Sequence, residues 1–280
     1  MAGSELASAV LGLASAASWG AGDFCGGLAT KRAGVYAVVI GSQLAGGAFL
    51  LLMAVALKER MPPLTNLLWC GAAGLMGALG LLALYRALAT GHMGTAAPVS
   101  AVVTAALPVL VGALVEGLPG ALKLFGFGLA IASVWLVSQS GREGFEFRHL
   151  GLPLAAGVGF GLFLVVMNRV NAGAVFWPLL AARAASISAL WIVARLTNQQ
   201  TLPQMKLLPL AALTGLLDVG GNAFYVFASQ VGRLDVAAVL SSLYPASTVL
   251  LAWLILKEHI ARAQTFGIAI ALVAIGMITV

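Results

Sequence analysis

Charged residues are scarce in this chain of 280 residues. Only 9% of them are Asp, Glu, Lys or Arg, whereas 61% are hydrophobic and the mean hydropathy is +1.03. A soluble domain carries roughly 25% charged residues, so the composition excludes an ordinary water-soluble fold. The solvent that such a chain requires is a lipid bilayer.

Other signatures are missing as well. Cys25 and Cys70 lie in apolar runs without metal-ligand or redox spacing, so we predict no metal site and no cofactor. The net charge of +6 is spread singly through short connectors, which argues against nucleic-acid binding. The start "MAGSELASAVLG" lacks the basic region of a cleaved signal peptide, so we expect the first apolar segment to be retained.

Long apolar segments fill most of the chain. About 20 apolar residues in a helix cross a bilayer, and ten segments of this kind are present. They are too continuous for the alternating strands of about ten residues in a membrane barrel, and a helix satisfies its own backbone hydrogen bonds in lipid. We therefore predict an all-α integral membrane protein with ten transmembrane helices, at 6–29, 34–57, 65–89, 94–116, 120–139, 150–170, 174–197, 207–231, 234–256 and 262–280.

The chain carries a weak internal repeat. Sliding it by 141 positions aligns residues 91–110 with residues 232–251 and places Trp19 over Phe160. Identities are sparse, but the offset holds over most of the half.

The repeat sets the expected topology. We predict a first five-helix repeat over 1–139, a central linker over 140–149 and a second five-helix repeat over 150–280. Because five is odd, the second repeat enters the membrane from the side opposite to the first. Inverted repeats of this kind build alternating-access transporters, whose substrate binds near the midplane at the repeat interface.

Three ionisable residues lie deep inside the predicted spans. Asp218 lies about ten residues into its span, roughly 15 Å from the boundary, and Arg183 lies about as deep in the preceding span. Asp23, in "SWGAGDFCGG", lies nearer the end of the first span. A charge at the bilayer centre costs about 2.5–3.5 kcal/mol on insertion scales, so these residues are the first candidates for a functional site.

Helical spacing groups polar residues around the two aspartates. Asn222 and Tyr225 follow Asp218 at i+4 and i+7, and Trp19 precedes Asp23 by one turn, so each group shares one helix face. Such a stripe lines a cavity or bonds to another helix, and both interpretations stay open here. Arg183 is a counter-charge for one aspartate, a partner for a substrate carboxylate, or a residue that snorkels to the interface.

Prolines mark a second pair of candidate positions. Pro98 and Pro108 lie in the fourth span, and Pro245 lies in its repeat mate, the ninth. Because proline kinks helices, and interrupted helices in corresponding positions point to a transport site, we predict helix breaks there. Ser241 and Tyr244 precede Pro245 as candidate substrate contacts, although a hydroxyl such as that of Ser241 also caps freed backbone groups.

The sequence resembles the EamA family of the drug/metabolite transporter superfamily. In that family a repeat ends with a serine-rich stretch, a proline, an apolar run and a Leu-x-Glu turn before a last Gly-rich helix. The opening "SWGAGDF" is similar to the family's Trp-Gly motif in the first helix. Here the corresponding residues of the second repeat are Ser241, Ser242, Pro245, Leu256 and Glu258.

The resemblance implies an exporter of small metabolites in the plasma (inner) membrane, with cytoplasmic termini. The charge distribution disagrees on the last point, because basic residues are more numerous in the connectors opposite the termini. No nucleotide-binding motif of the GxxxxGK[ST] type is present, so we expect transport to be coupled to a gradient or to exchange. The partners are a small-molecule substrate, such as an amino acid or an amphipathic compound, and the bilayer; a homo-oligomer is compatible with the sequence.

Two alternatives to a transporter remain at this point. A non-catalytic scaffold or receptor would use the same spans without a central polar site. The element "GAGD" at 20–23 also fits the Gly-x-Gly-Asp signature of intramembrane aspartyl proteases, in which Asp23 and Asp218 would share a proton. The order of the elements and the inverted repeat argue against that enzyme, so we predict no catalytic residues.

Overall fold

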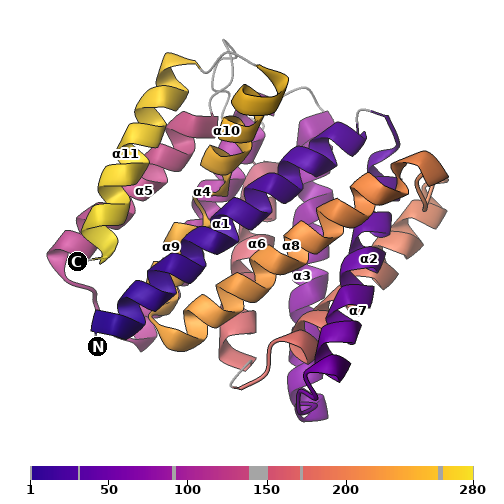
Figure 1. Cartoon of the computed structure of the whole chain (residues 1–280), viewed down its shortest axis with the longest axis horizontal. Coiled ribbons are helices and arrows are strands. Elements are labelled where there is room, and N and C mark those ends of the chain that lie inside the picture. Colours follow the sequence, from indigo (N-terminus) through magenta and orange to yellow (C-terminus); the bar gives the residue numbers. More distant parts are fainter. Residues whose placement is uncertain are drawn as a thin grey trace.

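The computed structural model describes residues 2–30, 32–89, 93–138, 151–170, 173–257 and 261–279, and in these ranges all regular secondary structure is helical. Figure 1 shows one bundle with both termini on the same side. The predicted linker 140–149 and Glu258 lie outside the described residues. The α-helices are α1 (Ala2–Thr30), α2 (Val35–Ala56), α3 (Leu64–Ala89), α4 (Met93–Val115), α5 (Ala121–Ser138), α6 (Gly151–Val170), α7 (Phe176–Leu196), α8 (Leu208–Val231), α9 (Leu234–Ser241), α10 (Tyr244–Leu256) and α11 (Arg262–Thr279), with a 3-10 turn, η2 (Met205–Leu207), before α8.

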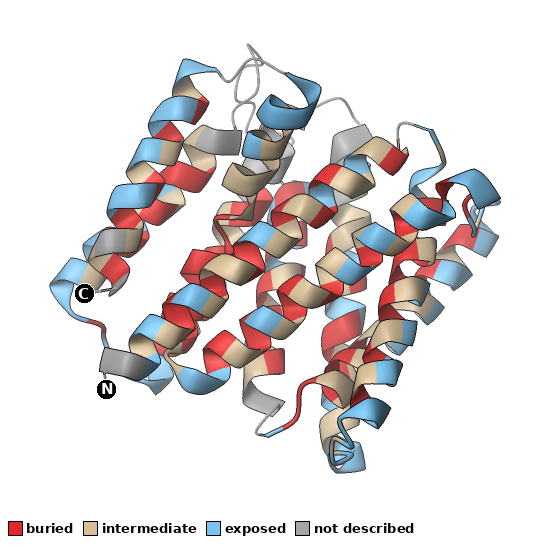
Figure 2. Cartoon of the chain, viewed as in Figure 1, coloured by how far each residue is buried: buried red, intermediate tan, exposed pale blue. Residues whose placement is uncertain are grey.

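The bundle has the surface of a multi-pass membrane protein. Within the described residues, six segments are long and apolar enough to cross a membrane, and shorter apolar helices accompany them. Large hydrophobic side chains are exposed on the outside, among them Leu110 at 65% and Phe125 at 63%. Figure 2 shows exposed positions recurring along the lengths of the helices. Such surfaces suit lipid rather than water.

The contacts between helices repeat with the two halves exchanged. Helix α1 packs along α8. The repeat mate of α1, α6, packs along α3, which is the mate of α8. In the same way, α1 packs on the two parts of the ninth span, α9 and α10, and α6 packs on their mate, α4. Three further contacts join a helix to its own mate: α2 to α7, α4 to α9, and α5 to α11. This reciprocity is what a two-fold axis between the halves produces, and the ten spans form a 5+5 inverted repeat.

The ends of α2 and α7 show the same equivalence at the level of single hydrogen bonds. Lys58 lies two positions after the end of α2 and Asn198 two positions after the end of α7, and their φ angles of 50° and 54° are in the left-handed region. The N–H of the next residue donates to a carbonyl five positions earlier in each case, from Glu59 to Ala54 (2.9 Å) and from Gln199 to Ala194 (2.8 Å). Both ends are therefore Schellman caps.

Matched glycines bring the two halves into close contact. Gly215 of α8 lies directly on the Ser42 carbonyl of α2, and its mate Gly74 of α3 lies on the Ala182 carbonyl of α7. In membranes, small residues let helix backbones approach closely and so provide packing energy. A Cβ at either position would overlap with a backbone oxygen that has no freedom to move away.

Span 9 is interrupted where the prolines predicted a break, whereas span 4 is not. α9 ends at Ser241, and α10 begins at Tyr244 with Pro245 in its first turn, a position at which proline loses no helical hydrogen bond. α4 continues through Pro98 and Pro108 without interruption. The break expected in span 4 is therefore absent, since a membrane helix tolerates an interior proline when its surroundings compensate the freed carbonyl.

We expect Gly215→Ala and Gly74→Ala each to destabilise the protein by about 1–3 kcal/mol, the usual cost of overpacking. Gly128→Ala is the matched control, because a Cβ at Gly128 of α5 meets nothing within 4 Å and alanine favours the helix. Thermal unfolding of the detergent-solubilised variants measures the difference. Equal midpoints for Gly215→Ala and Gly128→Ala would contradict the close packing.

Candidate functional site

Three serines of α1 fix its register against α8. Each Oγ donates a hydrogen bond to a carbonyl of α8, at 2.6 to 2.9 Å. The pairs are Ser8 to Ala228, Ser15 to Gly221 and Ser18 to Leu217. The start of α1 therefore lies beside the end of α8, at the end of the bundle that we call the terminal face; the other end is the opposite face.

Trp19 shows which side of α1 faces the interior of the bundle. Its ring stacks on Tyr225 of α8, with centroids 6.1 Å apart and planes at 27°, and meets Tyr244 of α10 edge-on at 6.3 Å. Gly221 makes room for the indole, since a Cβ there would overlap with it. The aromatic cluster thus joins three helices at the interface of the two repeats.

Asp23 lies one turn beyond Trp19 on the same interior face, yet it is exposed. The outer face of α1 carries other exposed residues, such as Val10 and Ala17. Asp23 is close enough to Asp218 and to Tyr244 for electrostatic interaction with both. No hydrogen bond or ion pair to Asp23 is found within the described ranges, so it is a solvent-accessible carboxylate inside the bundle.

Asp218 is held by two partners. The Arg183 Nη2 atom of α7 donates to Asp218 Oδ2 in an ion pair. Asn222 Nδ2 donates to the Asp218 carbonyl at 2.7 Å and to Oδ2 at 3.3 Å. The Asp218 side chain is 40% exposed and that of Arg183 is 14% exposed. Of the roles open for Arg183, the structure shows the counter-charge for Asp218, and pairing offsets part of the cost of placing both charges in the membrane.

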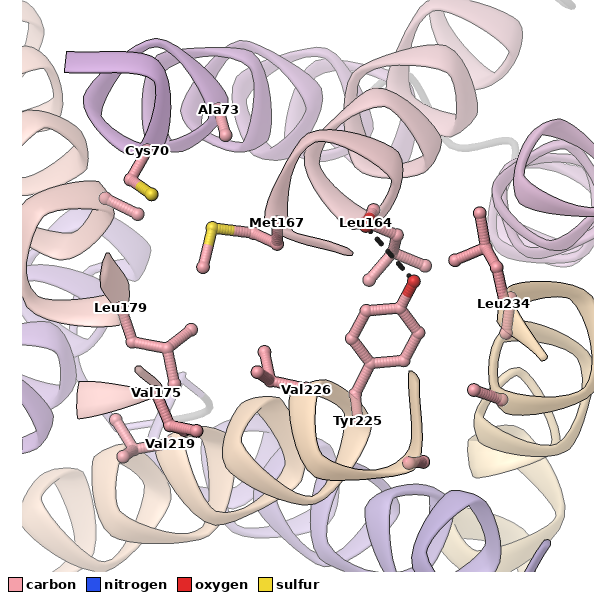
Figure 3. Close-up of a cluster of buried hydrophobic side chains, with 14 of the residues drawn as sticks. Cys70, Ala73, Leu164, Met167, Val175, Leu179, Val219, Tyr225, Val226 and Leu234 are labelled. Carbon is pink, nitrogen blue, oxygen red and sulfur yellow. Dashed lines mark hydrogen bonds between the residues drawn. The ribbon is translucent and has the colours of Figure 1, made fainter. Parts of the chain in front are cut away.

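Tyr225 closes the site on the side of the terminal face. It is buried, at 1% exposure, and its Oη donates to the Leu164 carbonyl of α6 at 3.1 Å. Figure 3 shows it within an apolar cluster that includes Met167, Val226 and Leu234. Tyr225 lies almost two turns from Asp218 toward the end of α8, so packed side chains separate the ion pair from the terminal face.

Two carboxylates of the first repeat bind the starts of second-repeat helices at the terminal face. We call the contacts of Glu59 with Val175, Phe176 and Trp177 the Glu59 clamp. Glu59, after α2, accepts hydrogen bonds from the N–H groups of Val175, Phe176 and Trp177 at the start of α7, at 2.7 to 3.1 Å. An anion at a helix N-terminus satisfies free donors and the helix dipole. Glu116, after α4, likewise accepts from the Leu234 N–H at the start of α9, at 3.2 and 3.3 Å.

Sequence reasoning missed the Glu59 clamp, because a loop carboxylate gives no sign of which helix end it will meet. It also grouped Ser241 with the substrate contacts. In the structure Ser241 is buried and donates to the Gly12 carbonyl of α1 at 3.3 Å, so it joins α9 to α1. The remaining candidates, from Trp19 to Tyr244, lie together between α1, α7, α8 and α10.

The chemistry of the site does not follow the two-fold symmetry. At the offset of 141, Asp218 corresponds to Gly77 and Asp23 to Leu164. The helical scaffold is therefore repeated in the two halves, whereas each of these aspartates has no ionisable counterpart in the other half. No group of three or more His, Cys, Asp or Glu that could hold a metal occurs within the described ranges.

A shared proton between two aspartates would require a hydrogen bond between Asp23 and Asp218. Across the described part of the chain none joins them, and Asp218 pairs with Arg183 instead. This arrangement does not match the acid–base pair of an aspartyl protease.

We expect Arg183→Met to destabilise the protein more than the double variant Arg183→Met/Asp218→Asn does. The single change leaves an uncompensated carboxylate in the bundle, whereas the double change removes both charges. Because Asp218 is partly exposed, we expect a difference of about 1–2 kcal/mol, below the 3–5 kcal/mol of a fully buried pair. A double-mutant cycle on thermal unfolding measures it, and strict additivity of the two changes would contradict the pairing.

We expect Glu59→Gln to open the terminal face more often. Cys70 lies in the apolar cluster at 0% exposure and reports on that opening, so its labelling by a maleimide in a Cys25→Ala background should speed up severalfold. Lys58→Gln, next to Glu59 and exposed, is the matched control and should label as slowly as the parent. An unchanged rate for Glu59→Gln would show that the clamp does not hold this face closed.

Comparisons with known proteins agree with this architecture. A search of curated proteins found no match. A crystal structure of a protein matches with a TM-score of 0.78 and 17% identity, over 96% of this chain and 95% of its own, which establishes the fold. The family profile described as EamA-like transporter family matches residues 6–139 and 149–280. The chain belongs to the EamA-like transporter family.

Proposed function

We propose that the protein is a secondary active transporter that exports small metabolites, such as amino acids or amphipathic compounds, across the plasma (inner) membrane. One observation carries the proposal. Asp23, Asp218 and Arg183 lie beside the aromatic cluster at the interface of the two repeats, and packed side chains close them off from the terminal face. Family membership supports transport rather than proteolysis or a scaffold role.

The inverted repeat supports alternating access as the mechanism. In the state observed, the Glu59 clamp and the cluster around Tyr225 close the terminal face. The opposite state would arise when the halves tilt about the two-fold axis, which breaks these contacts and packs the corresponding ends together. Substrate would bind between α1, α7, α8 and α10 and meet each side of the membrane in turn.

Asp218 is the best candidate for coupling to a proton gradient. Its carboxylate has a single charged partner among the described residues, Arg183, and is partly exposed. Protonation of the Asp218 carboxylate would release Arg183, and its deprotonation would restore the ion pair. The proton and the Arg183 guanidinium would thus bind the Asp218 carboxylate in turn. A residue with this role should be required for a pH gradient to drive accumulation of the substrate, but not for exchange of substrate across the membrane.

We expect Asp218→Asn to lose accumulation driven by an imposed pH gradient and to keep exchange of the same solute. Proteoliposomes with a pooled set of labelled amino acids and amines supply the assay, with wild type alongside. Glu5→Gln, which removes a carboxylate paired with Lys123 at the terminal face, is the control and should still accumulate solute. Equal accumulation by wild type and Asp218→Asn would contradict the coupling role.

A further inference from the structure

A second partnerless acceptor lies in the interior of the bundle, on α2. Gln43 is 5% exposed, and its Oε1 has no hydrogen-bond partner within the part of the chain that the structure describes. Leaving such a buried polar atom unpaired is unfavourable, because its desolvation is not compensated. An empty acceptor of this kind needs an explanation, and a ligand that donates to it is one.

The packing of α2 shows where Gln43 points. On one side of it, Ser42 and Gly46 contact Gly215 of α8. On the other side, Gly47 contacts the aliphatic part of the Arg183 side chain of α7, since a Cβ added at Gly47 would be 3.6 Å from Arg183 Cγ. Gly47 lies one turn beyond Gln43 on the same helix face. Gln43 therefore faces the space between α7 and α8, into which the Arg183–Asp218 pair projects.

Asp23 and Gln43 lie at the same level, on the two sides of Asp218. On the α1 side, a Cβ at Gly22 would be 3.4 Å from the Asp218 backbone nitrogen, and Asp23 follows Gly22. On the α2 side, Gly46 packs on Gly215, less than one turn from Asp218. Asp23 and Gln43, neither of which has a described hydrogen-bond donor, thus flank Asp218 of the ion pair.

The charges at this level do not balance. The described side chains supply two carboxylates, Asp23 and Asp218, and one guanidinium, Arg183, which already binds Asp218. A cationic ligand with N–H donors would compensate Asp23 and satisfy Gln43 Oε1. An anionic ligand would add a third negative charge, which a site of low dielectric disfavours.

The aromatic residues favour the same kind of ligand. Trp19 lies one turn from Asp23, and Tyr244 is within electrostatic range of it. Aromatic faces attract organic cations and also accept an apolar body by stacking. The site thus offers a charged end and an apolar wall.

We propose that the substrate is a protonated amine attached to an aromatic or apolar body, with its ammonium group between Asp23 and Gln43 and its body against Trp19 and Tyr244. This inference rests on the proposed transport function, because it names what the same site takes. It assigns Gln43 as a binding residue and makes Asp23 the counter-charge of the substrate, while Asp218 keeps its role with Arg183.

Three probes with one body and different charge test the inference. They are 2-phenylethylamine, phenylalanine and 3-phenylpropionate, which at neutral pH are a cation, a zwitterion and an anion. Binding of each to the purified full chain is measured by equilibrium dialysis, and exchange is measured separately in proteoliposomes. We expect the amine to bind at least tenfold more tightly than phenylalanine, and 3-phenylpropionate not to compete.

Two variants and a matched control locate the contacts. Asp23→Asn should weaken amine binding at least tenfold, and Gln43→Leu should weaken it severalfold. Ser133→Ala is the control, because Ser133 Oγ is the other buried side-chain atom without a partner in the described ranges, on α5 away from the site. It should bind the amine like wild type, and size-exclusion profiles check that all variants fold.

The outcomes separate the two proposals. Exchange of phenylalanine or 3-phenylpropionate in preference to the amine would leave transport standing and overturn the cation assignment. Amine binding that Asp23→Asn abolishes, without flux of any probe, would support the site and contradict transport. No amine binding to folded wild type, or binding unaffected by both Asp23→Asn and Gln43→Leu, would overturn the inference.

Discussion

The ion pair between Arg183 and Asp218 is the interaction around which the polar interior is arranged. Each group alone would be costly in a bilayer, and together they form the one charged contact found between α7 and α8 in the described ranges. Asn222 fixes the carboxylate from one turn away. Because the pair uses the only described guanidinium at this level, Asp23 and Gln43 are left without a described donor, and this imbalance is the basis for proposing a cationic ligand.

Symmetry and asymmetry have separate roles in the molecule. The repeated features are mechanical: the glycine contacts of Gly74 and Gly215, the Schellman caps of α2 and α7, and the exchange of packing partners between halves. A two-fold scaffold has two equivalent states, in which either end is closed. The ionisable residues of the site and the Glu59 clamp are not repeated, so the two states would differ in their chemistry.

Much of the site could be predicted from the sequence, because helix periodicity alone places residues on a face. The spacing of Trp19 and Asp23, and of Asp218 and Asn222, puts each pair on one helix face, and in the structure Trp19 and Asp218 both contact side chains of other helices. The spacing of residues along one helix does not indicate which other helix packs against it. The structure was therefore needed to identify Asp218, rather than Asp23, as the partner of Arg183.

The residues that sequence reasoning missed share a physical cause. Gln43 lies in an apolar run, and its unusual state is the absence of a partner, which only the packing of α2 against α7 and α8 reveals. Glu59 acts on a helix end more than a hundred positions away. At Pro98 and Pro108 the sequence predicted a break that the structure does not have. Proline indicates that a helical hydrogen bond is lost, but it does not indicate whether the surrounding helices keep the helix continuous.

The most direct test of the account is to lock the terminal face and measure flux. With Cys25 and Cys70 replaced, cysteines at positions 59 and 177 are joined by a short, reducible thiol-reactive linker, which substitutes a covalent bond for the Glu59 clamp. Alternating access predicts that the linked protein binds solute but does not exchange it, and that reduction restores exchange. Full exchange by the linked protein would contradict the claim that the two halves must separate at this face.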